Sequence, residues 1–242
     1  MKIACWSGPR NISTALMYSF SNRADCGAVD EPFYAAYLAA TGKDHPMRAE
    51  ILAAQPQDPE AVISALCDPV PAENAHVYQK HMAQHMLPAI RRDWWDGMAH
   101  LLLIRHPARV VASFTKGFAE AGLEDIGAVQ LAGIYDDLLA QGITPVVVEG
   151  SDVRAEPEGM LRAICDRIGI GWDSAMLSWP AGPKPVDGVW APVWYGAVHA
   201  STGFAGPEGP LPELDGRLAD MAEAAMPYYA RLAAVKISPE AG

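Results

Sequence analysis

The sequence predicts an α/β fold with a doubly wound parallel sheet in three layers, in which helices cover both faces of the strands. Two observations predict it. Short runs of apolar residues alternate along the chain with segments of helical periodicity. These runs are mostly apolar and do not alternate regularly with polar residues, which is typical of strands buried on both faces. No internal repeat or domain boundary is visible, so we expect residues 1–242 to form one domain.

The expected strands and helices follow one another in the order that such a sheet requires. The strand-like runs are Lys2–Trp6, a weaker Gly27–Asp30, His76–Gln79, His100–Ile104 and Pro145–Glu149. The helical patterns are Ser13–Asn22, Ala108–Ala119, Ile126–Ala140, Pro157–Ile168 and Leu214–Ala233. In the fourth helix, a proline at the first turn and Gly169 after the last turn are typical boundaries. Pro227 is expected to kink or break the last helix.

Two stretches do not fit this alternation. Residues 41–74 carry scattered polar helical segments, and we expect them to form an excursion from the sheet. Residues 180–212 are rich in proline, glycine and tryptophan but lack periodicity. A loop of this length in a compact domain is usually functional, and its aromatic residues argue against disorder. Two interpretations stay open: a lid or binding segment, or a packed loop that covers the sheet edge.

The composition of the chain indicates which classes of ligand it can bind and in which compartment we expect it. The formal net charge of −11 disfavours nucleic acid and anionic membrane surfaces as partners, since phosphates require a basic surface. An anionic ligand must then be held in a local basic pocket. The four cysteines are widely spaced, so neither a metal site nor a disulfide framework is expected. We find no leader pattern and no apolar stretch of about 20 residues, and we expect a cytoplasmic protein.

The first candidate binding segment joins the first strand to the first helix, in the run KIACW, SGPRNIST, ALMYSF. A tight loop at the carboxyl end of a parallel strand that opens a helix directs backbone N–H groups toward an anion. Gly8 and Pro9 suit the sharp turn, and Arg10 adds a fixed positive charge. Ser13 and Thr14 add hydroxyl donors. The loop lacks the glycine and lysine of a Walker A motif, and an ordinary strand-to-helix turn remains the alternative.

The second candidate segment is LLLIRHPARVVASF. Arg105 ends an expected strand, and Ser113 lies eight residues later in the following helix, whose first turn suits Pro107. An arginine at the carboxyl edge of a parallel sheet faces the crevice where such folds bind ligands. Its planar guanidinium suits phosphate. The alternative is an arginine that caps a helix or forms an ion pair.

These segments together resemble the sulfotransferase family. SGPRNIST resembles the family's 5′-phosphosulfate loop, and RHPARVVAS has the arginine and serine of its 3′-phosphate segment at the same spacing. VVVEGSDVRAEPEGMLRAICDRIGI is similar to the family's strand, acidic loop and helix. The three pieces occur in family order over residues 3–170, and the W-x-x-x-W-Y…STGF run resembles a plant and bacterial subgroup. The resemblance implies a fold like that of the P-loop NTPases.

The resemblance also implies a donor, 3′-phosphoadenosine 5′-phosphosulfate, and no metal. Arg105 and Ser113 would hold its 3′-phosphate. Arg10 stands where the family has a lysine that stabilises charge on the bridging oxygen. Ile12 replaces a glycine, so the loop cannot rely on glycine's dihedral freedom there. The phosphosulfate would be held by the loop residues Pro9, Arg10, Asn11, Ile12, Ser13 and Thr14.

The family's arginine–lysine–glycine triplet, which closes over the nucleotide in cytosolic members, is absent from this chain. Residues 180–204 must then provide a substitute. The two candidates are Lys184 and the run Ser201–Phe204.

Transfer to a hydroxyl or amine requires a group that takes the proton. Glu31, in VDEPFY, is favoured because some branches of the family use a glutamate; a helix N-terminal carboxylate is the alternative interpretation. His81 is the second candidate, since cytosolic members carry K-x-H here, but in this chain Lys80 and His81 are adjacent. Lys80 would stabilise charge near the transferring group. His85 is a further candidate.

The implied activity is sulfuryl transfer to a hydroxyl or amine of a small acceptor. Two alternatives stay open. One is a small-molecule or nucleotide kinase, which would need magnesium ligands and a loop lysine that we do not find. The other is a catalytically silent nucleotide-binding homologue. The sequence does not identify the acceptor, and it leaves a homo-oligomer open.

Overall fold

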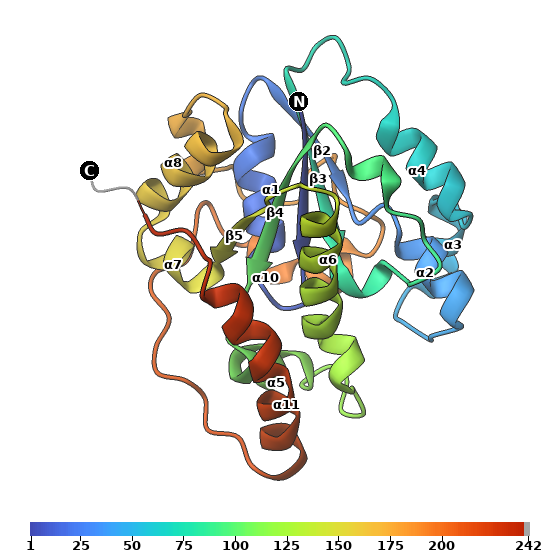
Figure 1. The fold of residues 1–242 in the computed structure, drawn as a ribbon, viewed down its shortest axis with the longest axis vertical. Helices are drawn as coiled ribbons and strands as arrows, with labels where there is room; N and C mark the ends of the chain where they lie inside the picture. The colour runs from blue at the N-terminus through green and yellow to red at the C-terminus, as the bar shows by residue number, and fades with distance from the viewer. Residues whose placement is uncertain (240–242) are drawn as a thin grey trace.

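The computed structural model describes residues 1–239 and is built around a five-stranded parallel sheet (Figure 1). Its strands are β1 (Lys2–Ser7), β2 (Cys26–Asp30), β3 (His76–Met82), β4 (Met98–Ile104) and β5 (Val146–Glu149). Their order across the sheet is β2-β3-β1-β4-β5. The connections reverse direction at β1, and ligands of open α/β sheets bind at such a point, outside the carboxyl ends of the strands. Residues 240–242 of the predicted domain lie outside the described residues.

Helices cover both faces of the sheet, which confirms the predicted layers (Figure 1). One face carries α1 (Ser13–Ser21), α7 (Gly150–Ala155) and α8 (Pro157–Ile168), and the other carries α4 (Pro59–Cys67), α6 (Ala128–Ala140) and α11 (Gly216–Ala233). Side chains of β1 alternate between the two cores. Ile3 and Cys5 pack with α1 and α8, whereas Ala4 and Trp6 pack with α6. Both faces of β1 are therefore buried, as its continuous apolar pattern predicts.

The five predicted strands are all present, with one difference that affects the site. β3 extends beyond its predicted end at Gln79, because it pairs with β1 as far as Met82. Lys80 and His81 are therefore residues of the strand and do not follow it. Successive strand residues point to opposite faces of a sheet, so these two side chains cannot enter the same pocket.

Four of the five predicted helices have different boundaries. Helix α1 ends at Ser21 instead of Asn22, and α11 begins at Gly216 instead of Leu214. The helix expected to reach Ala119 is α5 (Pro107–Phe114), and the chain turns at Gly117. The helix expected from Ile126 begins two residues later as α6, because Gly127 takes a φ of 72° that separates it from a preceding 3₁₀ turn.

The last helix, α11, runs through Pro227 without the predicted break. Pro227 has no N–H to donate to the carbonyl of Glu223 four residues earlier, and Glu223 is an exposed residue of the helix.

The excursion is helical, as expected, and lies beside the β2 and β3 edge (Figure 1). It contains α3 (Arg48–Ala54) and α4, and α2 (Tyr34–Thr41) leads into it from β2. The long irregular segment contains the short helices α9 (Ala191–Trp194) and α10 (Gly196–His199). Short 3₁₀ turns are Ala83–His85, Asp93–Trp95, Leu123–Ile126 and Ser174–Leu177. Over residues 1–239, the helices lack the combination of length and apolar character that crossing a bilayer requires.

The loop after β1 rests directly on the start of α6. A Cβ atom at Gly8 would lie 2.5 Å from the carbonyl oxygen of Ile126, and one at Gly127 would lie 3.1 Å from the Cα of Gly8. Only glycine allows this approach of the two backbones. The contact fixes the height of the β1–α1 loop above the sheet.

We expect Gly8→Ala to lower the free energy of unfolding by about 1–3 kcal/mol, because the added methyl group forces the two backbones apart. Gly133→Ala is the matched control. Gly133 lies on the exposed side of α6, where an added Cβ would have no neighbour within 4 Å, so alanine should stabilise the helix by about 0.5–1 kcal/mol. Urea denaturation of both variants measures the contrast, and equal stabilities would contradict it.

Candidate active site

In the loop between β1 and α1, the strained backbone conformation is that of Arg10. Arg10 has a φ of 55°, in the left-handed region that non-glycine residues rarely adopt. Ile12, at the position of the family's glycine, has φ −86° and ψ 20°, which demand no glycine. The replacement of that glycine is therefore compatible with the loop geometry of this chain.

Asn11 ties the same loop to the neighbouring strand. Its Nδ2 donates a hydrogen bond to the carbonyl of Leu103 at 3.1 Å, and its Oδ1 accepts one from the N–H of Ile12 at 2.9 Å. Both ends of the Asn11 amide are engaged within the protein. Asn11 thus holds the loop in place, and it also borders the cleft described next.

The two predicted anion-binding segments are in direct contact. Nε of Arg10 donates a hydrogen bond to Oγ of Ser113 at 2.9 Å, and the guanidinium of Arg105 donates to the carbonyl of Arg10. Arg10 and Arg105 therefore lie on one side of the sheet, at its carboxyl edge. A single ligand can contact both segments.

A cleft runs over this contact. Its lining joins the β1–α1 loop, Arg105 and Ser113 to the run Ser201–Phe204. Of the two candidates for the missing closing triplet, Ser201–Phe204 is thus at the cleft. Lys184 is not: its ammonium group donates to the carbonyl of Pro180 and lies 5.6 Å from the ring of Tyr18.

A second cavity adjoins the cleft and holds the candidate base. Glu31 and Lys80 lie among its lining residues, and Ser13 borders it as well. Arg10, Thr14 and Trp194 line both spaces, so the two meet at the β1–α1 loop. Most of the remaining wall is aromatic or imidazole: Tyr34, Tyr37, His45, His85, Phe114, Phe118 and Trp194.

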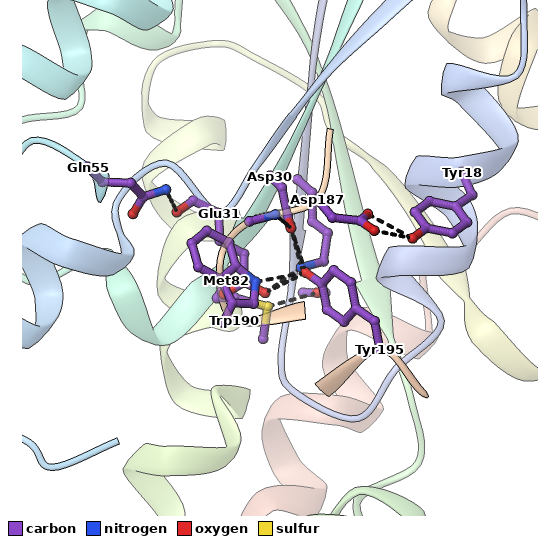
Figure 2. Close-up of polar contacts among 11 residues, drawn as sticks. Tyr18, Asp30, Glu31, Gln55, Met82, Asp187, Trp190 and Tyr195 are labelled. Atoms are coloured by element: carbon purple, nitrogen blue, oxygen red, sulfur yellow. Dashed lines mark hydrogen bonds and ion pairs between the residues drawn. The ribbon is translucent and has the colours of Figure 1, made fainter. Parts of the chain in front are cut away.

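Lys80 is buried among three polar partners. Its side chain is 1% exposed, and its Nζ donates to Oδ1 of Asp30 at 2.9 Å and to the carboxylate of Glu31. Nζ also donates to the hydroxyl of Tyr195 at 2.9 Å, and that hydroxyl donates to Oδ2 of Asp30 at 2.7 Å. Figure 2 shows Tyr195 directed at Asp30 and Glu31, with Trp190 donating to the same hydroxyl at 3.0 Å.

Burial and charge set the protonation of this cluster. Burial raises the pKa of Glu31, and Asp30 raises it further, while Lys80 opposes the shift. Burial alone would lower the pKa of Lys80, but the two carboxylates outweigh it, and the pKa of Lys80 is raised. Lys80 therefore stays charged, and Glu31 is a stronger base than a solvated carboxylate. A raised carboxyl pKa is what a general base near neutral pH requires.

The backbone of Glu31 is also strained. Its φ is 40°, and its N–H donates to the carbonyl of Lys80 at 2.8 Å. Gln55 donates to the carbonyl of Glu31 at 3.1 Å (Figure 2). Within residues 1–239, three non-glycine residues have positive φ, and two of them, Arg10 and Glu31, line the second cavity. Strained residues of this kind gather at functional sites, where the surrounding contacts hold them.

His81 lies apart from this site. Its ring stacks on Trp6 with centroids 4.2 Å apart, and its Nε2 is 3.2 Å from Oε1 of Gln79. Burial lowers the pKa of His81 to about 3, so the ring is neutral. Because β3 extends past Lys80, His81 points into the core on the opposite face of the sheet. The structure thus brings Glu31 and Lys80 together and leaves His81 out.

His85, the further candidate, does border the second cavity. Its ring is stacked against Tyr34 and Tyr37, with centroids 4.6 Å and 4.7 Å apart. Burial holds its pKa well below the ordinary value. His85 forms part of the aromatic wall.

A sequence model of the sulfotransferase domain family matches residues 1–236, which is nearly the whole chain. The chain belongs to the sulfotransferase family. Two solved sulfotransferases share the fold. The sulfotransferase domain from the curacin biosynthetic pathway has a TM-score of 0.57 at 15% identity and covers 98% of both chains. The sulfotransferase from Alicyclobacillus acidocaldarius has a TM-score of 0.55 at 14% identity, over 96% of this chain and 94% of the other.

Two curated relatives from Arabidopsis thaliana carry a different kind of name. "Branched-chain-amino-acid aminotransferase-like protein 1" is 40% identical over 208 residues, which cover 85% of this chain and 37% of that protein. "Branched-chain-amino-acid aminotransferase-like protein 2" is 37% identical over 206 residues, 85% of this chain and 36% of that protein. The chain therefore spans little more than a third of the length of these relatives.

Sequence reasoning missed two members of the Lys80 cluster. Asp30 immediately precedes Glu31, and it faces Lys80 in the register of β2 and β3. Two adjacent carboxylates after a strand were the available signal. Tyr195 lies 165 residues from Asp30 in the chain, in a segment without periodicity, and no local pattern indicates the contact.

We expect Tyr195→Phe to lower the free energy of unfolding by about 1–3 kcal/mol, because Lys80 and Asp30 each lose a buried hydrogen-bond partner. Tyr228→Phe, at a partly exposed position of α11, is the control and should leave stability unchanged. Chemical denaturation measures both variants. A Tyr195→Phe protein as stable as the control would show that the Lys80 cluster does not need a hydrogen bond from the segment 180–212.

Proposed function

We propose that this chain transfers a sulfuryl group from 3′-phosphoadenosine 5′-phosphosulfate to a hydroxyl or amine of a small acceptor. One observation carries the proposal. The cleft with the two anion-binding segments and the cavity with Glu31 meet at Arg10, which lines both. A donor in the first space and an acceptor in the second would react beside that guanidinium.

The residues of the cleft suit the donor nucleotide. Backbone N–H groups at the start of α1, together with Arg10 and Thr14, would hold the phosphosulfate. Arg105 and Ser113 would hold the 3′-phosphate, and their contacts with Arg10 bring both subsites within reach of one nucleotide. When bound, the nucleotide supplies the sulfuryl group.

The residues of the chain divide the chemistry between them. Glu31 takes the proton of the acceptor, and Lys80 holds the carboxylate of Glu31 in position. Arg10 stabilises negative charge where the departing oxygen lies. Trp194 and the aromatic wall exclude water, which would otherwise compete with the acceptor. The size and aromatic lining of this cavity favour a small acceptor with a flat or apolar body.

A ligand titration separates this function from its alternatives. The proposal predicts that adenosine 3′,5′-bisphosphate raises the melting temperature more than ADP does, with or without magnesium. The physical reason is that Arg105 and Ser113 add contacts to the 3′-phosphate. Stronger stabilisation by ADP with magnesium would favour a kinase instead. Binding of the bisphosphate without turnover across a panel of hydroxyl and amine acceptors would favour a catalytically silent homologue.

We expect Glu31→Gln to reduce kcat by about 10²–10⁴-fold, since it removes the proton acceptor. The wild-type rate should fall as pH drops through the pKa of Glu31, and this acid limb should lie above the ordinary carboxyl pKa because burial raises it. The limb should vanish in Glu31→Gln. Initial rates from pH 4 to 9 at saturating donor measure both effects.

Two controls accompany this measurement. Glu50→Gln removes a carboxylate from the exposed face of α3 and should keep the rate and its pH profile. His81→Gln should lower stability, since His81 packs on Trp6, but the folded variant should keep the acid limb. An acid limb that persists in Glu31→Gln and disappears in His81→Gln would reverse the assignment of the base.

A further inference from the structure

Three arginines converge on one carboxylate beside the cleft. Glu208 pairs with Arg105, with Nε of Arg109 at 2.8 Å and with Nη1 of Arg154 at 2.8 Å. The arginines come from the end of β4, from α5 and from α7. The Glu208 side chain is 4% exposed. Sequence patterns identified Arg105 alone.

Glu208 reaches this position from an irregular strap, residues 205–213, which lies between α10 and α11 (Figure 1). The neighbours of Glu208 on the strap, Gly206, Pro207 and Gly209, are exposed. The strap backbone is held by the same arginines: Arg154 donates to the carbonyl of Gly206 at 3.0 Å, and Arg109 donates to that of Gly209. The carboxylate of Glu208 and two backbone carbonyls of the strap are therefore held by the same arginine cluster.

The charges of the cluster do not balance. The arginines contribute three positive charges and Glu208 contributes one negative charge, which leaves a net charge of +2. A phosphate monoester near neutral pH carries about two negative charges and three strong acceptor oxygens. Three guanidinium groups that converge on one point suit such a dianion better than they suit a carboxylate.

The cluster opens onto the donor cleft. Arg105 and Arg154 line that cleft together with Arg10 and Ser113. Arg105 also donates to the carbonyl of Arg10, so the cluster and the β1–α1 loop share one arginine. A phosphate in the cleft can therefore reach the group that now pairs with Glu208.

We propose that Arg105, Arg109 and Arg154 form a subsite for a phosphate monoester dianion, and that Glu208 occupies it as an exchangeable counter-ion that leaves when the phosphate binds. The inference rests on the proposed function, since the phosphate concerned is the 3′-phosphate of the donor. It assigns Arg109 and Arg154 to nucleotide recognition, and it couples nucleotide binding to release of the 205–213 strap.

The exchange has a consequence for selectivity. A ligand must compete with Glu208 for the arginines, so its apparent affinity is lower than its intrinsic affinity for the open subsite. A dianion with three acceptor oxygens binds the three arginines more strongly than the carboxylate does, so its replacement of Glu208 lowers the free energy. A nucleotide without a 3′-phosphate leaves Glu208 in place and gains nothing from the cluster. Glu208 thus suppresses ligands of lower charge in a pocket that would otherwise attract many anions.

Calorimetric titration of the whole chain with adenosine 3′,5′-bisphosphate and with AMP tests the exchange. Glu208→Gln should bind the bisphosphate about five- to tenfold more tightly than the wild type does, because the competing charge is gone. Its affinity for AMP should not change. Glu213→Gln removes the same charge from an exposed position of the strap and should match the wild type with both ligands.

A second pair of variants tests the arginines. Arg154→Gln should weaken the bisphosphate about tenfold or more and leave AMP unchanged, since one of three charged donors is lost. Arg162→Gln, at an exposed position of α8 paired with Glu158, is the control and should bind both ligands as the wild type does. In the wild type, cleavage of the strap after Glu208 by a glutamate-specific protease should accelerate when the bisphosphate binds, because the carboxylate leaves the arginines, and this readout does not depend on any variant folding.

The outcomes separate the inference from the function on which it rests. If the wild type prefers the bisphosphate but Glu208→Gln binds it equally or more weakly, Glu208 is a permanent structural partner and the exchange is refuted. Slower or unchanged cleavage after Glu208 with the bisphosphate leads to the same conclusion. If the wild type does not prefer the bisphosphate over AMP, the proposed function and the inference both fail.

Discussion

A buried ammonium group organises the candidate active site of this protein. An unpaired charge in a protein interior costs several kcal/mol, so Lys80, at 1% side-chain exposure, requires anionic partners. Asp30 supplies one because β2 and β3 pair in register, and Glu31 supplies the other at the end of β2. The N–H of Glu31, whose backbone is in the left-handed region, donates to the carbonyl of Lys80. Tyr195, from the irregular segment 180–212, joins the same cluster through its hydroxyl.

The parallel register of the sheet then decides which spaces meet. β1 lies between β3 and β4, so the loop after β1 borders both the Lys80 cluster and the segment that begins at Arg105. Gly8 lets this loop rest on the start of α6, and Asn11 fastens it to β4. Between these two residues, Arg10 has a backbone in the left-handed region. Its guanidinium is held at the junction of the two cavities by Ser113, in a protein whose net charge is −11.

The sequence predicted those parts of the site that local patterns encode. The strand–loop–helix run and the Arg105–Ser113 spacing each lie within one supersecondary unit, and both segments meet in the structure. The position of His81 could not be predicted from local patterns. The extension of β3 past Gln79 places Lys80 and His81 on opposite faces, and that length depends on pairing with β1, which composition does not reveal. Tyr195 and Glu208 act across the fold from aperiodic segments, so only the tertiary structure identifies them.

The Lys80 cluster and the Glu208 cluster both pair buried charges of opposite sign, but their anionic partners are held in different ways. The carboxylates that neutralise Lys80 sit at the end of a strand, and Asp30 also accepts hydrogen bonds from Tyr195 and from the N–H of Gly188. These bonds hold the carboxylate of Asp30 in place, and the proposed base beside it, Glu31, must keep its position through turnover. Glu208 instead projects from an exposed strap. Fixed partners beside the proposed base and an exchangeable partner beside the proposed phosphate subsite would suit a transferase whose nucleotide must enter and leave in every cycle.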